Sequence, residues 1–144
     1  MNMQSRLYID LKLQTYSSDM IVSSLRHKIK GLDELFKYLP KDYSFHDAGL
    51  VSLTWDVEKE ELTVTYSCYH GIDKDNQHLY LVTFHLIPEM NDFEICMSPH
   101  NPYTYGIDIT YSDSMLSKYR FEADGSGPIV NCKNIWVEIR ESEL

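Results

Sequence analysis

Most of the chain beyond residue 48 alternates between apolar and polar side chains. The clearest case is a pair of segments, 51–57 and 62–70, joined by a short charged turn at residues 58–60. A period of two places alternate side chains on opposite faces of a strand, and a turn this short joins antiparallel neighbours. The pattern therefore predicts a β-hairpin here and a sheet built mainly from antiparallel strands.

Further segments of strand character lie on both sides of the hairpin: 5–15, 78–88, 93–97, 105–111, 118–123 and 129–139. Segment 78–88 is apolar on both faces, which favours a central strand. We expect Pro88 to end that strand, because proline has no N–H for the ladder. The last two segments are joined by the glycine-rich turn 124–128, which again favours antiparallel pairing.

One stretch before residue 40 has helical spacing instead. Its apolar residues recur at intervals close to three and four positions: Ile21, Leu25, Ile29, Leu32, Leu35, Phe36 and Leu39. Ser17 or Ser18 can cap the first turn. We expect Gly31 to break or bend the helix and Pro40 to end it, because proline disfavours helical geometry in the residue before it.

Together these patterns predict an α+β fold, a mostly antiparallel β-meander of six to eight strands with an N-terminal helical segment packed on the sheet. The chain has 144 residues and no stretch with the composition of a linker. We therefore expect a single domain over residues 1–144.

The charge balance constrains the partners. The chain has 13 Lys and Arg residues and 22 Asp and Glu residues, which give a formal net charge of −9. Nucleic-acid binding depends on cationic side chains that displace counterions, so this balance counts against DNA and RNA. A basic protein would be attracted to the surface. The alternative is that the charge only keeps the protein soluble.

Other sequence features bear on location. No apolar run approaches the roughly 20 residues that cross a bilayer, and the N-terminus lacks the features of a secretory signal. Cys68, Cys96 and Cys132 are odd in number and widely spaced, which is typical of reduced thiols rather than of a disulfide framework. We expect a cytoplasmic protein without membrane contact.

No motif for catalysis or cofactor binding is present. Cys68 and His70 have a spacing that suits two ligands on one strand face, but no second ligand pair accompanies them. The step Phe45-His46-Asp47 offers a base beside a carboxylate, or two metal ligands. Adjacent residues of a strand point to opposite faces, so a structural role for Phe45, His46 and Asp47 is the better interpretation. We expect no enzyme activity, cofactor or metal.

The aromatic residues carry more information. The chain has 11 tyrosines and 2 tryptophans, and several fall opposite the positions assigned to the core. Large amphipathic rings on a surface are enriched where proteins bind proteins. The predicted partner-binding residues combine such rings with the acidic second half of the chain: Tyr69, Tyr103, Trp136, Glu89, Asp92, Glu94 and Asp108. The alternative is that a second layer, or a second copy in a homodimer, covers these rings.

The order of motifs resembles a known group of proteins. A short amphipathic helix ends in LP, FHDA leads into a strand, a hairpin follows, and SPHNPYTYGIDITYSDSMLSKYRFEADG precedes a closing strand around NCKNIWVEI. Over residues 35–140 this layout resembles small β-rich immunity proteins of bacterial polymorphic toxin systems. The resemblance implies a cytoplasmic, non-enzymatic protein that binds and inhibits a cognate toxin, often a nuclease.

Two other classes remain open. One is a small-molecule-binding protein or enzyme, with a pocket between helix and sheet lined by His46, Tyr66 and His85. The other is a structural module that assembles with copies of itself. A pocket that holds these three residues would favour the first class, and the molecular mass in solution tests the second.

Overall fold

A computed structural model describes residues 6–10, 29–40, 43, 45–71, 76–97, 101–112 and 119–142. Within these residues the chain forms seven strands and one α-helix. In chain order they are β1 (Arg6–Asp10), α2 (Leu32–Tyr38), β2 (Gly49–Asp56), β3 (Glu61–Gly71), β4 (Gln77–Cys96), β5 (Thr104–Ser112), β6 (Tyr119–Gly125) and β7 (Gly127–Ser142). The prediction of a mostly antiparallel sheet is confirmed.

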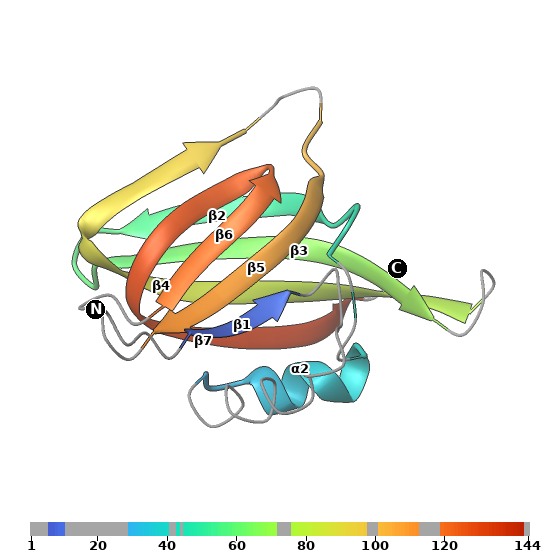
Figure 1. Cartoon of the computed structure of the whole chain (residues 1–144). Coiled ribbons are helices and arrows are strands. Elements are labelled where there is room, and N and C mark those ends of the chain that lie inside the picture. Colours follow the sequence, from blue (N-terminus) through green and yellow to red (C-terminus); the bar gives the residue numbers. More distant parts are fainter. Residues whose placement is uncertain are drawn as a thin grey trace.

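The strands form one sheet in the order β1-β5-β6-β7-β4-β3-β2, and all of its ladders are antiparallel (Figure 1). The order departs from a single meander at two places, because β1 pairs with β5 and β4 pairs with β7. Strands β2 to β4 form one meander and β5 to β7 another, and the two are joined because β7 pairs with β4. A 16-residue β7 is long enough to pair along both halves of β4.

The end predicted at Pro88 is wrong. Strand β4 runs through this proline, so the predicted strands 78–88 and 93–97 are parts of one strand. The pairing with β7 shifts register around Pro88 and resumes at Phe93, with Met90 at φ 59° between them. Because the ladder is irregular at this bend, the missing N–H of proline is tolerated. We call residues 93–97, beyond the bend, the β4 arm.

The helix begins directly after Gly31, where the sequence predicts a break or bend, and ends two residues before Pro40, which is predicted to end it. Gly31 has φ 94°, and a Cβ there would lie 1.8 Å from the Val137 carbonyl oxygen, so only glycine fits this close approach. The neighbouring Lys30 carbonyl accepts a hydrogen bond from the Val137 N–H at 2.9 Å. The cap predicted at Ser17 or Ser18, the first half of the predicted helix and residues 11–15 of the first predicted strand lie outside the described residues.

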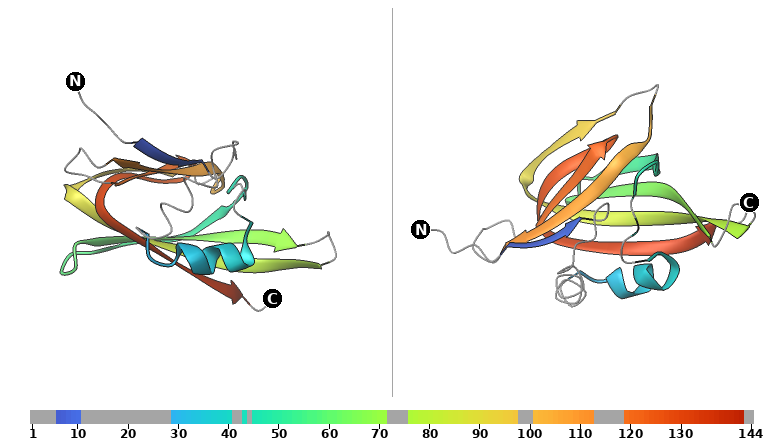
Figure 2. Two further views of the ribbon diagram at one scale, coloured as in Figure 1. Left: turned by 60° about the horizontal axis from the view of Figure 1, so that its bottom comes forward. Right: turned by 45° about the vertical axis from the view of Figure 1, so that its right-hand side comes forward.

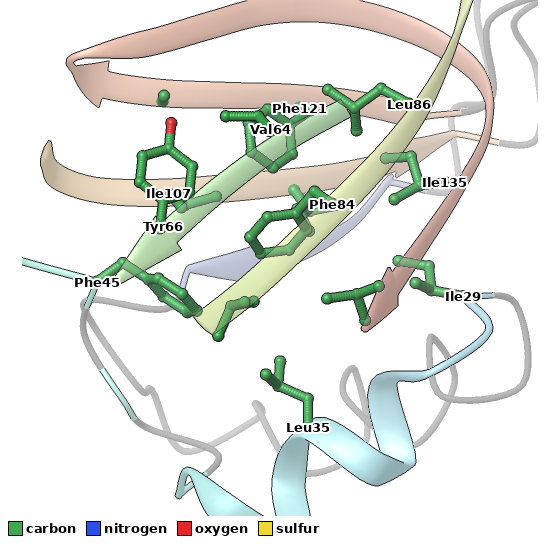
Figure 3. Packing of buried hydrophobic residues seen from close by; sticks show 14 of the residues in the cluster. Ile29, Leu35, Phe45, Val64, Tyr66, Phe84, Leu86, Ile107, Phe121 and Ile135 are labelled. Atoms are coloured by element: carbon green, nitrogen blue, oxygen red, sulfur yellow. The ribbon is translucent and has the colours of Figure 1, made fainter. Parts of the chain in front are cut away.

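The sheet curls so that β1, β5 and β6 lie over β2, β3 and β4, with β7 bending between the two layers (Figure 2). The core fills the space between the layers (Figure 3). Phe84 and Phe121 meet there with ring centroids 5.0 Å apart, and Leu32 and Leu35 of α2 are buried in the same cluster. The Tyr66 hydroxyl crosses the core and donates to the Ser126 carbonyl at 3.1 Å.

Candidate protein-binding surface

The segment FHDA forms the junction that joins the start of β2 to the start of β5. Phe45 is buried, and its carbonyl accepts a hydrogen bond from the Thr104 hydroxyl at 2.6 Å. The Asp47 N–H donates to the Thr104 carbonyl at 2.8 Å, and the Thr104 N–H donates to the Ala48 carbonyl at 2.9 Å. Asp47 has φ 68°, a conformation that Asp tolerates better than most residues. The backbone of this segment therefore closes the open side of the curled sheet at one end.

A second set of contacts supports the junction from the β6–β7 turn. The Ser126 hydroxyl donates to the Asn101 carbonyl at 2.8 Å, and its N–H donates to the Tyr103 carbonyl at 3.3 Å. Thr104 and Ser126 are the two buried polar residues among the described residues. The hydroxyls of both residues form hydrogen bonds at this junction, which hold the loop that carries Tyr103 in one position relative to β2.

Aromatic residues cover the outside of the junction. Tyr103 and Tyr105 are half exposed, and the His46 ring lies 6.0 Å from the Tyr105 ring. The Tyr103 ring lies beside Gly49, 3.7 Å from where a Cβ at that position would be. We call His46, Tyr103 and Tyr105 the tyrosine face. His46 Nδ1 is 3.1 Å from the Asp47 carboxylate, and both side chains are exposed.

An apolar groove lies next to the tyrosine face. It has a volume of about 340 Å³ and runs between β2 and the β4 arm. Its walls are formed by residues of β2 and the β4 arm, with one residue before β5 and one in the β6–β7 turn: Leu50, Val51, Ser52, Leu53, Ile95, Met97, Pro102 and Ser126. We call it the β2–β4 groove. Pro102 lines the groove and Tyr103 follows it in the chain, so the tyrosine face begins one residue from the groove.

Exposed hydrophobic side chains concentrate on this surface. In the described part of the chain, nine large hydrophobic residues are exposed. Five of them lie here: Val51, Ile95, Met97, Tyr103 and Tyr105. Contiguous exposed apolar surface of this kind marks sites of interaction in soluble proteins.

Sequence reasoning missed most of the groove. The alternation in β2 places Val51 and Val57 among inward residues, but they are 56% and 75% exposed. The β2–β3 register shifts between Leu50 and Ser52, which turns Val51 outward, and Val57 already belongs to the turn. The sequence around Ile95 and Met97 does not indicate that they line a groove, because the bend at Pro88 sets the direction of the β4 arm. On the tyrosine face, Tyr103 was among the predicted contact residues, and the alternation of Tyr105 with the buried Thr104 could have indicated that Tyr105 is exposed as well.

The structure brings together only some of the predicted contact residues. Tyr103 lies on the tyrosine face, and Glu94 is exposed on the β4 arm beside Ile95. Glu89 lies in the bend of β4, directly after Pro88. The backbone of Asp92 belongs to the same strand, but its side chain lies outside the described part.

The other predicted contacts lie elsewhere. Tyr69 is exposed near the end of β3. Asp108 sits in the middle of β5, paired with Glu122 of β6, and one of its carboxylate oxygens is buried. Trp136 lies on the outer face of β7, stacked on His85 with ring centroids 5.0 Å apart and an interplanar angle of 6°. These three residues do not join the groove.

His85 belongs to a polar cluster on the outer face of β3, β4 and β7. Its Nδ1 is 3.0 Å from Glu61 Oε1, and its Nε2 is 3.3 Å from Glu138 Oε2. The side chains of His85 and Glu61 are only 17% and 12% exposed. Nδ1 is hydrogen-bonded to Glu61 and one ring face is covered by Trp136, whereas the buried Nε2 makes no hydrogen bond among the described residues.

The pocket predicted between helix and sheet would hold His46, Tyr66 and His85. The structure separates these residues. Tyr66 is fully buried in the core, His46 is exposed at the junction, and His85 is on the outer face of β4. A pocket of about 370 Å³ does lie between α2 and the sheet, but its lining is different: Glu34, Leu81, Thr83, Val137, Glu138, Ile139 and Arg140.

The cysteines of β3 and β7 are buried. Burial raises the pKa of the Cys68 thiol to about 12, and that of Cys132 likewise to about 12. Cys96 is exposed. Among the residues with described positions, no three His, Cys, Asp or Glu side chains are grouped to hold a metal ion.

Searches with the whole chain found no matching protein-family model, curated protein or solved structure. In the described part of the molecule, no helix has the length and apolar character needed to cross a membrane.

Proposed function

We propose that this protein is a non-enzymatic immunity protein, which binds a basic toxin domain in the cytoplasm and blocks it. The observation that carries the proposal is the group of exposed apolar and aromatic side chains in the β2–β4 groove and on the neighbouring tyrosine face. Its centre offers rings and aliphatic side chains, which dominate binding energy when they are buried against a partner.

Charge around the surface supports a basic partner. Three acidic side chains are exposed at its margin. Asp47 follows His46, Glu94 precedes Ile95, and Asp124 of β6 pairs with Gly106 of β5. The whole chain has a formal net charge of −9 at pH 7. Opposite charges at a rim mainly raise the rate of association, whereas buried rings slow dissociation. The arrangement thus suits an inhibitor that must capture a toxin quickly and hold it.

The test begins with capture of partners from the native cell by the wild-type protein. A captured protein is then expressed alone and with each variant in a heterologous bacterium. We expect it to arrest growth alone, and the wild type to restore growth. Tyr103→Ala should lose much of this protection. Tyr38→Ala, which removes an exposed tyrosine from α2, should protect like the wild type.

Two results would overturn the proposal. One is a captured protein that does not arrest growth, or whose toxicity the wild type does not relieve. The other is full protection by Tyr103→Ala, which would remove the tyrosine face from the inhibitory contact. Glu94→Lys adds a check on charge, because it should slow association with the partner more at low than at high ionic strength.

A second candidate function is favoured by the pocket between α2 and the sheet. Arg140 lies on its wall, and the pocket volume of about 370 Å³ suits a small ligand. Glu34 and Glu138 line the same pocket, so a small zwitterion fits its charges better than an anion. A thermal-shift screen of free amino acids with Arg140→Gln as the control tests it. Stabilisation that disappears in this variant supports the pocket.

A further inference from the structure

The wall of the curled sheet is incomplete at the β2–β4 groove. Strand β4 leaves β3 at the bend near Pro88, and its arm pairs only with β7 in the described residues. On the other side of the groove, β2 pairs with β3. Beyond Leu50, whose N–H donates to the Pro102 carbonyl, no ladder is described on its outer edge. Two strand edges therefore flank the groove.

Core side chains are partly uncovered at the same place. Leu50, Leu53, Trp55 and Phe93 pack against the core but are only half buried, and all four belong to β2 or to the β4 arm. The Trp55 and Phe93 rings meet at 5.3 Å, which joins the two strands at the closed end of the groove. Toward Val51 and Met97 the strands are separated by the pocket itself. A further strand would cover these side chains.

We infer that the partner inserts an extended segment into this groove, pairing its backbone with the outer edge of β2. This rests on the proposed function, because it names how the partner occupies that same surface. Strand addition supplies main-chain hydrogen bonds along an edge and places alternate side chains on opposite sides. One set would point into the groove, against Leu53 and Ile95, and the other would face solvent.

The length and charge of the groove indicate the length and composition of the inserted partner segment. The part of β2 whose outer edge has no ladder within the described residues covers residues 51–56, about 20 Å of extended chain at roughly 3.4 Å per residue. A segment of six to eight residues therefore fits. Glu94 lies on one side of the groove, and the turn that follows β2 exposes Glu58, Lys59 and Glu60, which leaves it with a net negative charge. We expect apolar residues at alternate positions and Lys or Arg at the flanks.

The experiment uses the full chain and a phage library of random dodecapeptides. Selected peptides are synthesised and their affinity is measured for the wild type and for two matched variants. Val51→Arg places a guanidinium in the groove, whereas Val57→Arg makes the same change at an exposed residue of the turn. We expect Val51→Arg to weaken binding at least about tenfold and Val57→Arg to leave it within about twofold.

Strand pairing has a distinct signature. Methylation of backbone nitrogens, one at a time, should abolish binding at every second peptide position, because alternate residues of an added strand donate to the edge. Uniform tolerance of methylation would overturn the inference, as would a library that yields no peptide able to distinguish Val51→Arg from Val57→Arg. Dimerisation of the protein itself that Val51→Arg abolishes would also overturn it, in favour of a second copy.

The two proposals can fail separately. A toxin that is neutralised in a way dependent on Tyr103, together with methylation-tolerant peptides, would keep the immunity function and remove strand insertion. Peptides with the alternating signature, together with a captured partner that is not toxic, would keep strand insertion and remove the immunity function.

Discussion

Replacing Thr104 with valine tests whether the junction holds the curled sheet closed. The substitution keeps the shape of the side chain and removes only the hydroxyl that donates to the Phe45 carbonyl at 2.6 Å. That carbonyl keeps a second bond, because the Ala48 N–H donates to it at 3.0 Å. The substitution should therefore lower the free energy of unfolding by an amount at the lower end of what an unsatisfied buried polar group costs. We expect the free energy of unfolding to fall by about 1 kcal/mol.

A loss of this size corresponds to a decrease in Tm of about 3–4 °C for a chain of this length. Urea unfolding followed by tryptophan fluorescence measures the free energy of unfolding, and thermal unfolding with the same signal measures Tm. Thr54→Val is the matched control, because Thr54 is exposed on β2 and no hydrogen bond of its hydroxyl is described. It should change stability by less than about 0.5 kcal/mol.

Amide exchange gives a local readout of the same change. The Asp47 N–H donates to the Thr104 carbonyl, so its exchange should accelerate in Thr104→Val and not in Thr54→Val. Equal stability of the two variants, with unchanged exchange at Asp47, would refute the role assigned to the junction.

Other predictions concern the core. Gly127 has φ 141°, and a Cβ there would lie 1.9 Å from the Tyr66 hydroxyl. Gly127→Ala should therefore lower the free energy of unfolding by at least about 2 kcal/mol, and adding Tyr66→Phe should restore part of it. Strictly additive effects of the two substitutions in urea unfolding would contradict this. At pH 8 a thiol reagent should modify Cys96 alone in the native protein, and fast labelling of Cys68 or Cys132 would show that their burial is wrong. The pKa values of Cys68 and Cys132 are raised in the folded state from 9.0 to about 12, so their contribution to stability is complete below pH 9 and is lost between pH 9 and 12, by about 1.4 kcal/mol per pH unit for each thiol. Alkaline titration of the urea midpoint, compared with that of Cys68→Ala, checks the slope.

The local patterns predicted the strands well where one face is buried and the other is not. Segments 51–57 and 62–70 form the expected hairpin, and the alternation in β3 places every second residue in the core. Helix α2 follows from its spacing and from Gly31 and Pro40. These features depend on neighbours within a few positions, which the sequence contains.

The surface could not be predicted in the same way. The pairing of β7 with β4, the register shift beside Val51 and the continuation of β4 past Pro88 depend on contacts between residues far apart in the chain. They decide that Val51 faces outward and that Met97 lines the groove, while Trp136 is held by His85 on another face. The sequence determines that the chain builds antiparallel strands with a defined apolar face, because alternation is a local property. Only the tertiary structure decides where that sheet curls, where it closes at Thr104 and where its wall stays open, because each of these depends on which distant strand becomes the neighbour.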